Sequence, residues 1–141
     1  MNVTITYSGI SADIYKVTGL HGKKAGDVEK IAGTSDEEDL LKRFFRDSSG
    51  ALLSATGNYG TISSTSDTSI TYSLNLPTSF PSNMTTSIEE LMKSFTTNYI
   101  ISRWFEVVAD QQNMQFYLLK CQEFQNALAI NLNKRTKQTI S

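Results

Sequence analysis

The side chain most often used for acid–base chemistry at neutral pH occurs once in this chain, as His21. It lies in the run GLHGKK (19–24), with no second histidine and no nearby cysteine to share a metal ion. The run has neither the spacing nor the Ser/Thr residue of a Walker phosphate loop. We therefore expect a surface loop, in which Lys23 and Lys24 are candidate charged contacts with a partner.

The acidic clusters and the single cysteine offer little more chemistry. The acids at 36–39 and 89–90 each fall where a helix is predicted to begin, and negative charge there stabilises the helix dipole. Cys121 lies among apolar residues at helical spacing, so we expect a buried small hydrophobe rather than a reactive thiol. The sequence therefore predicts no catalytic residue, metal ligand or cofactor, and a protein that is not an enzyme.

Two alternatives stay open beside this expectation. A small enzyme could assemble its site from scattered polar residues such as His21, Tyr72 and Asp110. A nucleic-acid-binding accessory protein could use the loop lysines and the basic end of the chain, although the net charge of −1 provides no attracting field. The candidate charged contacts at that end are Lys134, Arg135 and Lys137.

The N-terminal half is predicted to hold a strand, an irregular segment and a helix. Apolar and polar residues alternate over 3–7, which is typical of a strand with one buried face. Four glycines are scattered through 10–33, so we expect an irregular or weakly helical, glycine-bearing arm. Ser35 and the acids after it form a helix-capping signal, and apolar residues then recur every three or four positions. We expect a helix over 36–56.

A β-hairpin is predicted next, over 60–76. Ile70, Tyr72 and Leu74 alternate with small polar residues, which indicates a half-buried strand. The polar stretch before this strand, at 64–68, is typical of a hairpin tip, so the residues that precede it should pair as the first strand.

Two helices are predicted to complete the chain. A capping signal at Ser87 opens the first, over 88–109, and apolar residues occupy nearly its whole circumference. Such a helix is central to its domain or shared with a neighbouring subunit. Asp110 is a candidate cap for the second helix, over 111–133, and the short connection favours an antiparallel helical hairpin.

These elements define a mainly helical α+β fold in a single domain, 1–141, with a basic flexible tail at 134–141. The N-terminus lacks a signal-peptide pattern, and no apolar run approaches the length of a membrane span. We expect a soluble chain that contacts neither a membrane nor a small-molecule substrate.

The order of these elements along the chain is similar to that in a known group of proteins. The acidic-capped helix and the Thr/Ser-rich hairpin precede the block SIEELMKSF (87–95), which runs into YIISRWF (99–105). This arrangement resembles small virion proteins of tailed bacteriophages and prophages, including crAss-like phages, in which a similar block is followed by a last helix and a basic end. The resemblance covers 35–137 loosely, and its most specific residues lie at 100–105.

The resemblance implies a structural role in the virion, after assembly in the host cytoplasm. Such proteins form an oligomeric ring in the phage neck, as a head–tail connector or adaptor between portal and tail. Its partners would be copies of itself, the portal protein and tail or other neck proteins, with passing contact to DNA. A tail-completion protein of the same phage is the alternative within this class. The residues we expect at protein interfaces are Ile70, Tyr72, Leu74, Ile100, Trp104 and Phe105.

Overall fold

The structure, a computed structural model, describes residues 1–25 and 35–134 of the chain. They form four α-helices and one small antiparallel sheet, which confirms the mainly helical α+β class. The elements in chain order are β1 (Asn2–Thr6), α1 (Tyr7–Ala25), α3 (Ser35–Thr56), β2 (Gly60–Thr65), β3 (Ser69–Leu74), α4 (Thr85–Val107) and α5 (Gln111–Leu132). Short 3-10 turns at Gly57–Tyr59 and Ser82–Met84 precede β2 and α4.

The sheet has the order β1-β3-β2, so the strand that is central in space is the last in sequence. The expected alternation holds in β3, where Ile70, Tyr72 and Leu74 are buried. Val3 lies opposite Tyr72 and Ile5 opposite Ile70, so the apolar residues of β1 and β3 share one face. Because side chains alternate along a strand, the hydroxyl residues between them form the other face.

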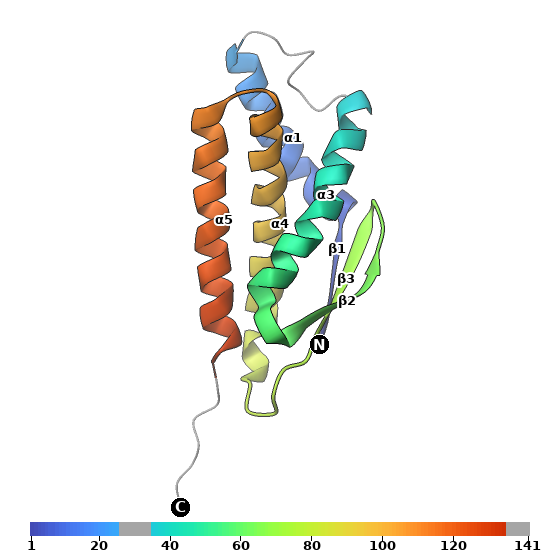
Figure 1. The fold of residues 1–141 in the computed structure, drawn as a ribbon, viewed down its shortest axis with the longest axis vertical. Coiled ribbons are helices and arrows are strands. Elements are labelled where there is room, and N and C mark those ends of the chain that lie inside the picture. The colour runs from blue at the N-terminus through green and yellow to red at the C-terminus, as the bar shows by residue number, and fades with distance from the viewer. Residues whose placement is uncertain (26–34, 135–141) are drawn as a thin grey trace, which may run out of the picture.

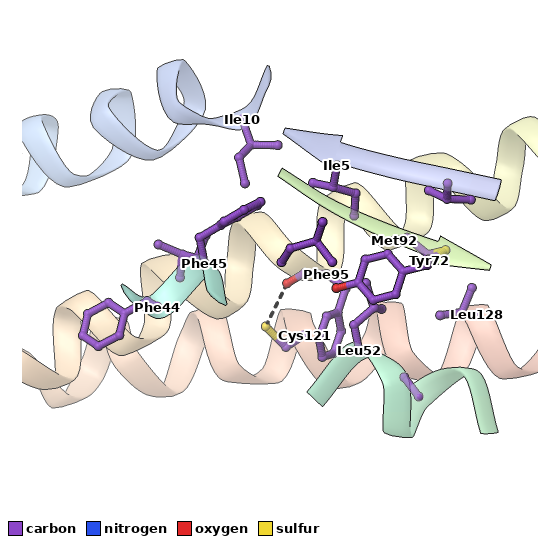
Figure 2. Packing of buried hydrophobic residues seen from close by; sticks show 14 of the residues in the cluster. Ile5, Ile10, Phe44, Phe45, Leu52, Tyr72, Met92, Phe95, Cys121 and Leu128 are labelled. Atoms are coloured by element: carbon purple, nitrogen blue, oxygen red, sulfur yellow. Dashed lines mark hydrogen bonds between the residues drawn. The ribbon is translucent and has the colours of Figure 1, made fainter. Parts of the chain in front are cut away.

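Helix α4 is the centre of the domain. It packs along α5 and also contacts α1 and α3, so three elements of the same chain surround it. Figure 1 shows α5 along one side of the molecule and the sheet on the other, with α4 between them. The core gathers side chains from every layer, including Ile5, Leu52, Tyr72, Met92 and Leu128 (Figure 2).

The expected arm over 10–33, irregular or weakly helical, is a regular helix in its first part. Residues 10–25 belong to α1, and 26–33 lie outside the described residues. Ile10 and Ile14 are buried one helical turn apart, with 4% and 0% of their surfaces exposed. Their burial against the core stabilises the helix by more than the penalty of about 1 kcal/mol for each interior glycine.

The predicted helix ends are correct in two places and wrong in one. Gly57 adopts a φ of 60° immediately after α3, as expected of a helix stop. Asp110 caps α5, because its carboxylate accepts a hydrogen bond of 3.2 Å from the backbone N–H of Asn113. Helix α4, however, begins at Thr85, so Ser87 lies inside its first turn rather than capping it.

Gly60, where β2 begins, is required for steric reasons. A Cβ atom at this position would lie 2.1 Å from the Oγ1 atom of Thr56, well inside contact distance. The close approach of the end of α3 to the start of β2 therefore depends on a residue without a side chain.

Tyr72 carries a buried hydroxyl without a hydrogen-bond partner among the described residues. Burial also raises the pKa of this phenol. Since an unsatisfied buried hydroxyl destabilises the folded state, we expect Tyr72→Phe to raise the free energy of unfolding by about 1 kcal/mol. Urea denaturation followed by circular dichroism measures this change.

The matched control is Tyr7→Phe. The Tyr7 hydroxyl lies 2.9 Å from that of Tyr15, so its removal breaks a hydrogen bond and should destabilise the fold by about 1 kcal/mol. Equal destabilisation by both variants would contradict the assignment of Tyr72 as unsatisfied.

Candidate protein-binding surface

The residues expected at protein interfaces lie inside the chain's own core. The three on β3 point at the helices and the three on α4 point at α1, α3 or α5, and none has more than 1% of its surface exposed. Trp104 and Phe105 contact each other edge to face, with ring centroids 5.2 Å apart. In this fold the six side chains present no surface to a partner, because α4 is surrounded by its own chain. The six are Ile70, Tyr72, Leu74, Ile100, Trp104 and Phe105.

The expected charged contacts are largely beyond what the structure describes. Arg135 and Lys137 lie outside the described residues, and Lys23 and Lys24 belong to α1 in a part whose side chains are not described. Lys134 is exposed just after α5. Of these five residues, the structure therefore describes the side chain of Lys134 alone.

Helix α5 carries a second apolar stripe that the sequence reasoning missed. Its buried side is formed by Cys121, Leu128 and Leu132, which face α4 and the core. About half a helical turn away lie Phe116, Leu119, Glu123 and Ile130, spaced by three, four and seven residues. We call these four residues the α5 outer face.

The apolar members of the α5 outer face are well exposed. Phe116 exposes 51% of its surface, Leu119 59% and Ile130 64%. Elsewhere, Leu118 of α5 exposes 42% of its surface, and Val107, at the end of α4, exposes 56%. Figure 1 shows α5 at the margin of the molecule, with α4 on its inner side. Large apolar side chains gathered on one outer helix are typical of a protein interaction surface.

The same helix is unusually poor in charge. Lys120 and Glu123 are its only charged residues in 22 positions, whereas charged residues form 19% of the whole chain. Glutamine, asparagine and alanine fill most of the remaining outward positions. Charged residues are depleted in the centre of protein interfaces, so this composition suits a surface that becomes covered.

Phe116 is held in a defined orientation at this surface. Its ring lies edge to face with Tyr117, with centroids 5.0 Å apart, and the Lys120 Nζ atom lies 5.0 Å from the Phe116 centroid. The cation and the neighbouring ring restrict the side chain before any partner arrives. Aromatic anchors that are ordered in advance lose less conformational entropy on binding.

Two hollows on the described surface are bordered by α1 and α4. One of about 390 Å³ is bordered by Asp13, Glu90 and Lys93, and a second of about 370 Å³ shares Asp13 with it. The Thr97 hydroxyl, which borders both, donates to the Lys93 carbonyl of its own helix. Part of the polar lining is therefore turned back onto α4.

Cys121 is chemically protected. The thiol is 3% exposed and lies 3.7 Å from the Phe95 carbonyl oxygen, as Figure 2 shows. Burial raises its pKa from 9.0 to about 12, so the nucleophilic thiolate is scarce at neutral pH. The sequence predicted that Cys121 is a buried, small hydrophobic residue, and its burial in the structure agrees with this prediction.

This raised pKa predicts a pH-dependent stability. Above pH 9 the unfolded chain loses the thiol proton while the folded chain keeps it up to about pH 12, so the free energy of unfolding falls as pH rises. Between pH 8 and 10 the decrease from this group should be about 1.4 kcal/mol. Denaturation of wild type and Cys121→Ala at both pH values measures it, and equal decreases in the two proteins would contradict the assignment.

Among the described residues, no group of three His, Cys, Asp or Glu side chains is arranged to hold a metal ion. None of the helices in that part of the chain combines the length and apolar character needed to cross a membrane. Comparison with known proteins gives no matching family model, no matching curated protein and no matching solved structure. The resemblance to phage virion proteins therefore stays a prediction.

Proposed function

We propose that this chain is a structural protein that acts by binding other proteins, and that the α5 outer face is one of its contact surfaces. The observation that carries the proposal is the exposure of Phe116, Leu119 and Ile130 on a helix with two charged residues. Exposed apolar area of this kind is stabilised when a partner covers it. The thiol of Cys121, in contrast to these exposed side chains, is buried, and its raised pKa keeps it protonated at neutral pH.

The finer proposal concerns the assembly. The order of elements and the block at 99–105 support a ring in the neck of a tailed phage, between portal and tail, with copies of the chain as neighbours. Within that block Arg103 lies over Phe44, with its guanidinium carbon 5.3 Å from the ring centroid. The block thus joins α4 to α3, and its role in this fold is to hold the helices together.

Sedimentation of the purified chain tests the proposal. We expect species larger than the 15.7 kDa chain, either for the chain alone or after a tailed-phage portal protein is added. A species of one chain under both conditions would contradict the proposal. The neighbouring genes test its finer part, since portal, capsid or tail genes support a virion role and metabolic genes oppose it.

A further inference from the structure

Within residues 1–25 and 35–134, each edge strand of the sheet lacks a second strand neighbour, and both have an unusual composition. In the order β1-β3-β2 the first and the last strand each have one neighbour. The three strands read NVTIT, GTISST and SITYSL, so none carries a charged residue or a proline. Monomeric proteins commonly protect such edges with charge, proline or a bulge. β2 has one irregularity, between Ile62 and Ser64, and β1 pairs regularly along its length.

The hydrogen bonds of β1 show which of its backbone groups face outward. Tyr7 donates its N–H to the Thr68 carbonyl, and the Met1 carbonyl accepts from Leu74, so odd-numbered positions face β3. Alternate residues of a strand point their backbone groups to opposite sides. The N–H and C=O groups of Asn2 and Thr4 therefore point to the free edge, and the side chains of both residues are exposed.

The two free edges match in direction. β1 and β2 are each antiparallel to β3, so they run in the same direction as each other. Copies of the chain can be related by rotation about an axis that runs parallel to the strands. In such an arrangement β2 of one copy lies beside β1 of the next, and the two strands are parallel. Joining two different patches in this way is the heterologous contact that closes a ring.

We propose that β1 of each copy pairs in parallel with β2 of the next, so that the sheets of a ring of identical chains are continuous. The inference rests on the ring proposed above and assigns its subunit contact. On the core-facing side of the sheet, Val3 meets Ile62 of the next copy, because both lie opposite Tyr72, and Ile5 meets Thr65, because both lie opposite Ile70. The outer face continues as a surface of hydroxyl groups.

The register follows from the symmetry. Thr4 and Ser64 both lie opposite Thr71, so they occupy the same row across the sheet. A pure rotation about an axis along the strands keeps each row at its own height. Ser64 of the next copy should therefore lie beside Thr4, with both side chains on the exposed outer face.

Disulfide trapping tests the contact. The double variant Thr4→Cys/Ser64→Cys is oxidised in the assembled state, and we expect covalent species larger than dimers. Each single variant should give no covalent oligomer beyond background, and wild type, with its buried Cys121, is the control. Dimers from Thr4→Cys alone would indicate β1 pairing with β1 about a two-fold axis and would overturn the inference.

A second variant blocks the edge without removing the β1–β3 ladder. Thr4→Pro deletes an N–H that points outward, and proline is tolerated on edge strands. We expect this variant to fold, by circular dichroism, and to lose assembly by sedimentation, while Thr4→Val keeps the N–H and assembles.

The outcomes separate this inference from the proposed function. The edge contact alone is overturned by three results together. Wild type sediments as a ring, the Thr4→Cys/Ser64→Cys variant forms no disulfide-linked species, and Thr4→Pro folds and assembles fully. A wild type that stays a single chain under all conditions overturns both.

Discussion

Replacing Trp104 by alanine is expected to lower the free energy of unfolding by about 3–5 kcal/mol, the largest stability effect of any single substitution we predict. Trp104 is 1% exposed on the central helix and packs edge to face on Phe105. Its removal leaves a cavity between α4 and the elements around it. Because whole domains are stable by only about 5–15 kcal/mol, the variant should be close to unfolding at 37 °C.

Urea denaturation followed by far-ultraviolet circular dichroism measures this loss, since the variant has no tryptophan to report by fluorescence. Val107→Ala is the matched control, three residues further along α4 and 56% exposed. That change should alter stability by no more than about 0.5 kcal/mol. Similar losses in the two variants would contradict the placement of Trp104 in the core.

Replacing Leu119 by glutamate is expected to have the largest effect on assembly. The change removes an apolar side chain from the α5 outer face and places a second carboxylate one helical turn from Glu123, so a partner would have to bury two like charges. A loss of about 2 kcal/mol or more at the contact raises the concentration needed for half-assembly roughly 30-fold. Sedimentation over a concentration series measures this midpoint.

Gln122→Glu is the control for that experiment. It adds the same charge to an exposed position of α5, yet removes no apolar surface and lies about a quarter turn from the outer face. We expect its assembly to change much less than that of Leu119→Glu. Equal midpoints for wild type and Leu119→Glu would show that the α5 outer face is not a contact surface.

The parts of the fold that sequence predicted best are those with strong local signals. The alternation in β3 fixed which side chains are buried, and Asp110 caps α5 as its position indicated. The regular helix α1 was missed because the four glycines of 10–33 indicated irregular structure. The spacing of Tyr7, Ile10 and Ile14 was the available signal, and its effect depends on packing against elements far along the chain.

The interface prediction failed for a related reason. A helix that is apolar on most sides needs neighbours, but sequence alone does not say whether they come from the same chain. Here α1, α3 and α5 supply them, and the six expected residues are enclosed. The second stripe on α5 was present in the spacing of Phe116, Leu119 and Ile130. It was overlooked because the apolar residues around Cys121 were already sufficient to predict a helix with one buried side.

Thiol labelling on α5 tests the central claim, that the α5 outer face is covered by a partner, most directly. Asn126→Cys places a thiol at an exposed position beside Leu119 and Ile130 without removing either, and Asp47→Cys on α3 is the control. We predict that assembly slows labelling at position 126 strongly and at position 47 little. Equal labelling rates at position 126 in the single chain and in the assembly would contradict the claim.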